Sequence, residues 1–288
     1  MKPAKFSYEA PRTLDEALHS LATWRDDAKI IAGGQSLAPM LNMRLARPDH
    51  LIDINRLTEL DRIALDGEQL MIGAMARHAR LQRDALVKLH APMLAHAAET
   101  IGHYAIRQRG TIGGSLAHAD PAAQLPLATL TLDAEFELRS AVGTRTLSAA
   151  ASFLSIFTTA LEPDELLATI HIPVARPREG FGFRLFNRRA GDFAIVAVAV
   201  TLARGEGATI DRLRLAIAGI GPVPLRIDNL VPREDAAAVR AGWSARIAPA
   251  VAAAVKIEDN ERTPLVFRRE LVERLVRDAL DDALERAS

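Results

Sequence analysis

Two glycine pairs, each followed closely by a serine, are the residues of this chain whose types and spacing best suit chemistry. The first lies in Ala32-Gly33-Gly34-Gln35-Ser36 and the second in Thr111-Ile112-Gly113-Gly114-Ser115. Glycine permits positive φ and lets another group approach the backbone closely, and successive N–H groups in such turns form anion-binding nests. Ser36, Thr111 and Ser115 add hydroxyl donors. The two segments are therefore candidates for holding the two phosphates of a dinucleotide.

Spacing alone leaves this interpretation open beside a plainer one, because a Gly-Gly pair is more often only a turn. The chain has neither the G-x-G-x-x-G pattern of a Rossmann site nor a P-loop. His118 and Asp120 would supply only two metal ligands, which is too few for a site. No Ser-His-Asp or paired-carboxylate arrangement is indicated either. The sequence therefore predicts no metal site and no catalytic side chain.

Composition narrows the class of protein. The 288 residues are 49% hydrophobic, which suffices for one large or two modest domains. Lys+Arg and Asp+Glu number 36 each, so we expect no binding to nucleic acid or to a membrane surface. The absence of cysteine excludes a Cys-ligated iron–sulfur cluster on this chain. The N-terminal segment lacks the apolar stretch of a signal peptide, and the longest apolar run, 193–203, is too short to span a bilayer, so a cytoplasmic protein is expected.

The elements that must position the glycine pairs follow from capping, turn and periodicity signals. Thr13-Leu14-Asp15-Glu16 is a capping box that opens a helix to about Trp24, and Asp66-Gly67 indicates a hairpin. Strands are expected over 28–32, 51–54, 135–138, 167–173, 181–186, 193–204 and 213–220. Helices are expected over 86–101, 124–132, 233–255 and 266–286, and a glycine-bearing loop over 107–121. The segment 174–180 has the composition of a linker. The pattern indicates an α+β chain with a boundary near residue 176.

Longer strings point to one family. IIAGGQSL (30–37) and RGTIGGSLAHADPAAQLP (109–126) closely resemble the FAD-binding medium subunit of the molybdenum hydroxylase family, which includes aerobic carbon monoxide dehydrogenase and xanthine dehydrogenase-like enzymes. LIDINRL (51–57), IGAMARH (72–78), LLATIHIP (166–173) and FRLFNRRAGDFAIVAVAV (183–200) extend the resemblance over essentially the whole chain. It implies a PCMH-type (vanillyl-alcohol-oxidase-like) FAD-binding domain over 1–176. A smaller α+β C-terminal domain, like that of the CO dehydrogenase flavoprotein, would follow over 177–288.

The resemblance also implies roles for individual residues. The implied cofactor-binding positions are Ala32, Gly33, Gly34, Gln35, Ser36, Thr111, Ile112, Gly113, Gly114, Ser115, Asp120, Leu167, Arg184 and Phe193. Asp120 matches an acidic position that contacts the cofactor, and Leu167 an apolar position against the flavin or its adenine end. Arg184 stands where relatives often have a lysine near the flavin. Phe193 stands where some relatives have a tyrosine over the flavin, so a hydrogen bond made by that hydroxyl would be absent here.

The implied activity is electron transfer through FAD in an oxidoreductase. A large partner subunit would carry the molybdenum cofactor and a small one two [2Fe–2S] clusters, in a dimer of heterotrimers. Electrons would reach FAD on this chain and leave to an external acceptor. Two alternatives stay open at this point: a stand-alone FAD-dependent oxidase acting on a small organic substrate, and a structural subunit without FAD.

Overall fold

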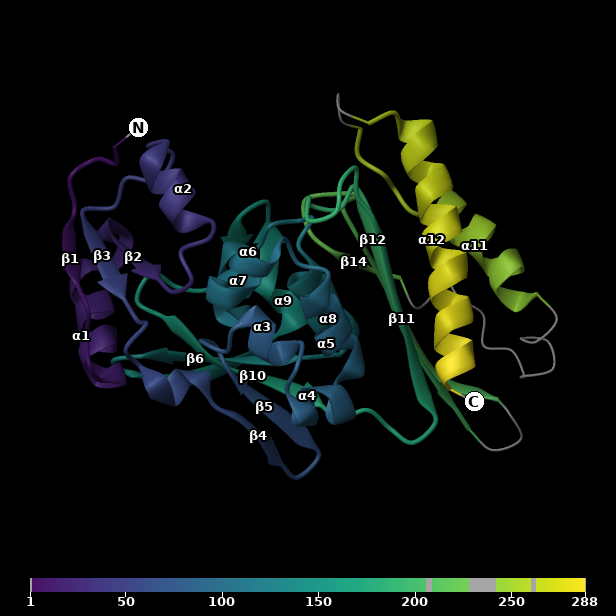
Figure 1. Ribbon diagram of the computed structural model, residues 1–288, viewed down its shortest axis with the longest axis horizontal. Coiled ribbons are helices and arrows are strands. Elements are labelled where there is room, and N and C mark those ends of the chain that lie inside the picture. Colours follow the sequence, from purple (N-terminus) through teal and green to yellow (C-terminus); the bar gives the residue numbers. More distant parts are fainter. Residues whose placement is uncertain (1, 206–208, 228–241, 260–262, 288) are drawn as a thin grey trace.

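The computed structural model describes residues 2–205, 209–227, 242–259 and 263–287. Within them the chain builds a small sheet, a larger sheet with helices packed beside it, and a third sheet flanked by two helices near the C-terminus (Figure 1). This mixture of separate sheets and helices is the α+β content that the sequence predicts.

The first sheet is parallel and leads into the first glycine segment. Its strands, in the order β1-β3-β2, are β1 (Ser7–Glu9), β2 (Ala28–Ile31) and β3 (His50–Asp53). The predicted start of helix α1 (Leu14–Trp24) is confirmed, because Thr13 Oγ1 caps it by accepting the N–H of Glu16 at 3.2 Å. The Glu16 carboxylate accepts the N–H of Arg12 at 2.7 Å, one residue before the position that a capping box would use. Helix α2 (Leu37–Asn42) begins where the glycine segment ends, so β2 and α2 fix that segment at both ends.

The second sheet is antiparallel, with the order β4-β5-β10-β6-β7. Its strands are β4 (Ile63–Asp66), β5 (Gln69–Gly73), β6 (Glu135–Ser140), β7 (Gly143–Ser148) and β10 (Leu166–Pro173). The predicted hairpin is confirmed: Gly67 has a φ of 56° in the turn from β4 to β5, a conformation that glycine adopts without strain. The smaller elements are the 3-10 turns Arg25–Asp27 and Thr58–Asp61, α9 (Ala149–Ser152), β8 (Phe153–Ser155) and β9 (Thr158–Thr159).

The helices between β5 and β6 differ from the expected ones in two places. They are α3 (His78–Leu81), α4 (Ala85–His90), α5 (Pro92–Glu99), α6 (Tyr104–Arg109), α7 (Ile112–His118) and α8 (Gln124–Thr131). A single helix over 86–101 is wrong, because the backbone leaves the helical region at Ala91 (φ −140°, ψ 59°) and Pro92 starts a new helix. The loop expected over 107–121 is also wrong, since α6 and α7 occupy most of it.

The third sheet is antiparallel and covered on both faces. Its strands, in sheet order, are β11 (Glu179–Phe186), β12 (Val196–Arg204), β13 (Ile210–Ala218) and β14 (Leu225–Arg226). Ala197 and Ala199 of β12 face the helices of the first half, whereas Val198 and Val200 face α11 (Trp243–Ala254) and α12 (Leu265–Arg286). Small side chains on one face let the two halves approach closely. The helix expected over 233–255 is described only from Trp243, because 228–241 lie outside the described residues.

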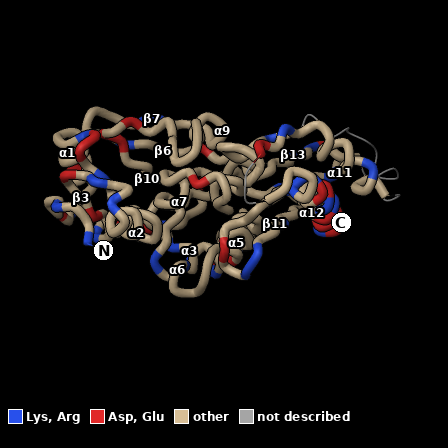
Figure 2. The backbone as a smooth tube through the Cα atoms, turned by 90° about the horizontal axis from the view of Figure 1, so that it is seen from above, with Lys and Arg blue, Asp and Glu red and all other residues tan. Residues whose placement is uncertain are grey.

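Charges are distributed over both halves of the molecule. Figure 2 shows acidic and basic residues interspersed along the chain, with opposite charges close together on α12. Among the described residues, no helix is long and apolar enough to cross a bilayer.

Candidate functional site

The first glycine segment is a turn whose backbone donors point to no protein acceptor. Gly34 has a φ of 69°, and Gln35 Nε2 donates to the carbonyl of Gly33 at 2.8 Å, which folds the turn back on itself. Within the described part of the chain, the N–H groups of residues 33–37 make no hydrogen bond to protein. Successive unsatisfied N–H groups form a nest of positive partial charge. This segment is therefore suited to hold a phosphate.

The second glycine segment is the first part of helix α7. Thr111 Oγ1 caps the helix by accepting the N–H of Gly114 at 3.1 Å, and its side chain is buried. The N–H of Ile112 donates to the carbonyl of Ala76, and that of Gly113 to the carbonyl of Ala74. Thr111, Ile112 and Gly113 thus use these groups inside the protein. Gly114 is exposed and Ser115 half-buried, so these two residues offer this segment's accessible surface.

The structure brings the two segments together. A Cβ on Gly33 would lie 2.3 Å from the carbonyl oxygen of Arg109 and 2.8 Å from Cα of Gly110, so the two backbones touch there. A Cβ on Gly114 would lie 4.0 Å from Cβ of Ala32. The two segments therefore lie side by side, although about eighty positions separate them in the sequence. This juxtaposition is what a ligand with two phosphates requires.

Two residues that the sequence analysis missed connect the segments. Asn55 Nδ2 donates to the carbonyl of Ala32 at 2.8 Å, and Arg77 Nη2 donates to Asn55 Oδ1 at 2.7 Å. Arg77 Nη1 also donates to the carbonyl of Arg109. Asn55 was detectable only as part of a D-x-N turn. Arg77 gave no local signal, since its partners lie 22 and 32 positions away.

A carboxylate anchors this connection. Asp53 accepts hydrogen bonds from Tyr8 Oη at 2.6 Å and from Asn55 Nδ2 at 2.6 Å. Partial burial opposes its ionisation, but the hydrogen bonds from Tyr8 and Asn55 outweigh burial and hold the pKa of Asp53 below its ordinary value. Burial also lowers the pKa of Arg77. The carboxylate is therefore ionised at neutral pH, and it accepts only.

The buried His78 holds the second segment in place by hydrogen bonds. Its ring Nε2 donates to the carbonyl of Thr111 at 2.9 Å, and its backbone N–H donates to the carbonyl of Gly110 at 3.0 Å. Burial, opposed by the hydrogen bond to Thr111 and reinforced by the charge of Arg77, lowers the pKa of His78 to about 4. The ring is therefore neutral at pH 7, with its proton on Nε2.

Asp120 lies close to α7 in the chain, and Leu167 lies close to it in space. Asp120 follows the left-handed Ala119 that ends α7, and its Oδ1 accepts the N–H of Ala122 at 2.8 Å. Leu167 is buried in β10, at a bulge beside Ala168, whose carbonyl accepts the N–H of Ala74. Ala74 in turn lies against Gly113. Both residues therefore belong to the shell around the second segment.

Arg184 and Phe193 come from the second half of the chain and are placed differently. The Arg184 guanidinium donates to Asp282 of α12 at 2.7 Å, on the face of β11 that packs against that helix. The structure thus ties Arg184 to α12 instead of the glycine segments. Phe193 is 60% exposed in the turn before β12. A Cβ on Gly191 in the same turn would lie 2.5 Å from the ring of His103, so this turn lies against the start of α6.

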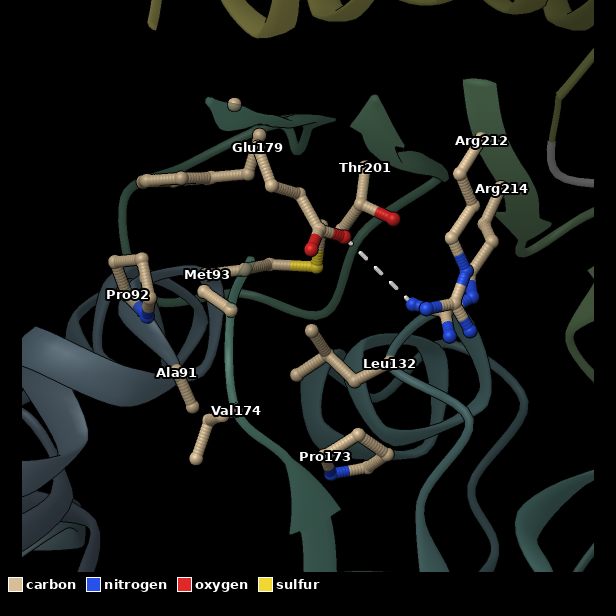
Figure 3. A pocket seen from close by; sticks show the side chains of 13 residues that line it. Ala91, Pro92, Met93, Leu132, Pro173, Val174, Glu179, Thr201, Arg212 and Arg214 are labelled. Carbon is tan, nitrogen blue, oxygen red and sulfur yellow. Dashed lines mark ion pairs between the residues drawn. The ribbon is translucent and has the colours of Figure 1, made fainter. Parts of the chain in front are cut away.

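A separate small cavity lies between the two halves (Figure 3). Its volume is about 20 Å³, and Glu179, Thr201, Arg212 and Arg214 form its polar part. A volume of roughly 10–15 Å³ is needed for one water. This cavity has room for about one water molecule and cannot admit a nucleotide.

An ion-pair cluster beside that cavity joins the two halves. Asp133, which follows α8, pairs with Arg212 at 2.9 Å and also with Arg214 and Arg226. Arg214 is only 3% exposed, and its second carboxylate partner, Glu179, lies 3.7 Å away. Asp133 is therefore the principal counter-charge of a buried guanidinium.

Comparisons with known proteins identify the family. Residues 4–175 match the model described as the FAD binding domain in molybdopterin dehydrogenase, and residues 181–283 match the CO dehydrogenase flavoprotein C-terminal domain. The chain belongs to this FAD-binding family. It is 37% identical to the 6-hydroxypseudooxynicotine dehydrogenase complex subunit alpha of Paenarthrobacter nicotinovorans, over 100% of this chain and 97% of the relative. It is 38% identical to the carbon monoxide dehydrogenase medium chain of Hydrogenophaga pseudoflava, over 78% of each.

Comparison with solved structures indicates the same family for this flavoprotein. It superposes on a chain of carbon monoxide dehydrogenase from Hydrogenophaga pseudoflava with a TM-score of 0.94, at 33% identity and over 100% of both chains. It superposes on a chain of quinoline 2-oxidoreductase from Pseudomonas putida 86 with a TM-score of 0.92, at 31% identity, over 100% of this chain and 99% of that one. The resemblance read from the sequence is confirmed: this is an FAD-binding medium-subunit homologue of molybdenum-dependent oxidoreductases.

The residues present fit FAD. The nest at 33–37 supplies uncharged donors for a pyrophosphate, and Gly114 leaves the facing backbone open. Among the described residues no group of three or more His, Asp or Glu side chains could hold a metal ion. With no cysteine, this chain cannot hold a cysteine-ligated iron–sulfur cluster.

Proposed function

We propose that this chain binds FAD between its two glycine segments and transfers electrons within a heterotrimeric molybdenum hydroxylase. The observation that carries the proposal is the unsatisfied N–H nest at 33–37 facing the exposed Gly114. The proposed site comprises Ala32 to Ser36, Gly114 and Ser115 at the pyrophosphate, with Thr111, Ile112, Gly113, Asp120 and Leu167 around the second segment. Phe193 is proposed to lie near the flavin, because its turn contacts the start of α6. A flavin role for Arg184 rests on the family resemblance alone.

The fold assignment belongs to the same proposal. Residues 1–176 would form the PCMH-type FAD-binding domain and residues 177–288 the C-terminal flavoprotein domain. The alanine side chains on one face of β12 let the C-terminal domain pack closely against the FAD-binding domain, which supports a fixed arrangement of the two domains. The neutral, buried His78 and the cap by Thr111 hold the second segment without adding negative charge near the phosphates.

The partner assignment rests on relatives named as subunits of dehydrogenase complexes. A small subunit would deliver electrons from its [2Fe–2S] clusters, and a large subunit would hold the molybdenum cofactor, in a dimer of heterotrimers located in the cytoplasm. FAD supplies the redox chemistry when bound. This chain binds and orients it, and leaves an edge accessible to an external acceptor.

The purified chain tests the cofactor, and the reconstituted complex tests the subunit role. We expect yellow protein that releases FAD, identified by chromatography after acid denaturation. Release of FMN or of no flavin contradicts the proposal. Co-expression with the two partner subunits should give one complex containing molybdenum, iron and FAD. In that complex, substrate should still reduce the iron–sulfur clusters after FAD is removed, while transfer to the acceptor stops.

The same preparation separates this function from a stand-alone oxidase. If the isolated chain oxidises an organic substrate at enzyme-like rates, roughly 1–10³ s⁻¹, the subunit role is wrong.

A further inference from the structure

We propose that Asn55 and Arg77 form a clamp that fixes the two glycine segments relative to each other and thereby sets the affinity for FAD. A continuous path of hydrogen bonds runs from the carbonyl of Ala32 through Asn55 and Arg77 to the carbonyl of Arg109. These carbonyls stand next to Gly33 and Gly110, where the two backbones touch. The clamp rests on the proposed cofactor site, and its residues act by positioning the site.

The Asn55 side chain has only one orientation that satisfies its neighbours. Its Nδ2 group donates to two acceptors, the Asp53 carboxylate and the carbonyl of Ala32. Its Oδ1 accepts from Arg77, which only donates. Because Asp53 is held ionised by the hydrogen bonds from Tyr8 and Asn55, it cannot donate to Oδ1. Asp53 therefore fixes the amide in the orientation that ties both segments.

The position of Asn55 separates this role from one in folding. Asn55 is exposed, lies in the turn after β3, and is absent from the three hydrophobic clusters of the described residues. Its backbone N–H donates to Asp53 Oδ1 at 2.9 Å, and alanine or serine at this position keeps that donor. Replacement of its side chain should therefore leave the core intact. The effect should appear at the nest, because the carbonyl of Ala32 immediately precedes its donors.

The experiment compares Asn55→Ala and Asn55→Ser with the matched control Asn42→Ala, at an exposed asparagine that ends α2. Full-length apoprotein is titrated with FAD by flavin fluorescence, and melting temperatures are recorded with and without FAD. Loss of one or two hydrogen bonds should raise the Kd for FAD about tenfold in both variants. The melting temperature of the apoprotein should match that of the control, and the rise caused by FAD should shrink.

Arg77→Met, with the exposed Arg274→Met as its control, should weaken FAD binding at least as much, because it frees both Asn55 and the carbonyl of Arg109. Should Arg77→Met not be recovered folded, the Asn55 variants decide alone. Weaker binding with an unchanged apoprotein melting temperature supports the clamp, and any other combination in the Asn55 variants overturns it. If the wild-type chain itself binds no FAD, the proposed function fails and the clamp fails with it, whereas wild-type affinity in the Asn55 variants overturns the clamp alone.

Discussion

The carbonyl oxygen of Arg109 occupies the place where a side chain on residue 33 would begin, 2.3 Å from an ideal Cβ of Gly33. Gly33→Ala must therefore push the two segments apart. We expect a loss of about 1–3 kcal/mol in the free energy of unfolding, as for other overpacked sites, together with weaker FAD binding. Urea denaturation measures the first effect and flavin titration the second.

The control for this variant is Gly143→Ala, because a Cβ there would meet no atom within 4 Å. Its stability should stay within about 0.5 kcal/mol of wild type. Equal stabilities of the two alanine variants would show that the segments do not touch.

Gly113 and Gly114 should respond differently to alanine. A Cβ on Gly113 would lie 2.5 Å from Cβ of Ala74, so Gly113→Ala should lower stability by about 1–3 kcal/mol through packing. A Cβ on Gly114 would approach only the Thr111 hydroxyl within 3 Å and would otherwise project toward Ala32. Alanine is also the better helix former by about 1 kcal/mol, which offsets a disturbed cap.

Gly114→Ala should therefore fold as stably as wild type but bind FAD about tenfold more weakly, because its methyl group would project toward Ala32 and hinder the close approach of the pyrophosphate to the two segments. Equilibrium dialysis of both variants checks this contrast. Normal FAD affinity in Gly114→Ala would place the pyrophosphate elsewhere.

The buried, neutral His78 should make stability depend on pH. Its pKa falls from 6.5 to about 4 on folding, so the unfolded chain binds more protons between these values. Its contribution is present above pH 6.5 and is lost as the pH falls toward 4. At pH 5 the loss is about 2 kcal/mol.

Urea unfolding of wild type and His78→Gln at pH 7 and pH 5 tests this, because Gln keeps a donor near the Nε2 position and does not titrate. Other titrating groups act equally in both proteins. Wild type should lose about 2 kcal/mol more than the variant between these pH values. Parallel pH profiles would mean that folding does not shift the pKa of His78.

Asp133 should carry much of the coupling between the two halves. Asp133→Asn keeps a residue that tolerates the left-handed backbone (φ 52°) but removes the main counter-charge of the buried Arg214. Breaking a buried ion pair in this way costs about 3–5 kcal/mol. Calorimetry should show a lower melting temperature. The control, Asp278→Asn, breaks an exposed pair with Arg274 and should cost less than about 1 kcal/mol. A similar melting temperature for both variants would contradict this role.

Local signals predicted the elements that depend on local chemistry. The cap at Thr13 and the turn at Gly67 each need only neighbouring residues, and both are confirmed. The break at Ala91 was missed although Pro92 marks it, because apolar periodicity continues across it. Helix α7 was missed because glycines disfavour a helix by about 1 kcal/mol each. Its cap by Thr111 and the contact of Gly113 with Ala74 stabilise it in the fold.

Only those parts of the candidate site that depend on neighbouring residues in one segment were predictable from the sequence. The glycine segments were visible in the sequence because their residue types require close approach. The contact of Gly33 with Arg109 and the path through Asn55 and Arg77 depend on how four separate parts of the chain pack. No spacing rule within one segment encodes such contacts. The same reason explains why the ion pair of Arg184 with Asp282 of α12 was not predictable from the sequence.

Because the nest at 33–37 presents main-chain amides, its hold on an anion does not depend on the ionisation of any side chain there. Between mildly acidic and mildly alkaline conditions these donors keep the same number of protons, whereas a lysine or histidine in their place would add its own titration. A substitution at Ser36 also leaves the amides in place, because the Ser36 side chain does not cap α2, whereas one at Gln35 removes the bond to the Gly33 carbonyl that holds the turn. A mutational scan of the segment should therefore tolerate changes at Ser36 far better than changes at Gly33.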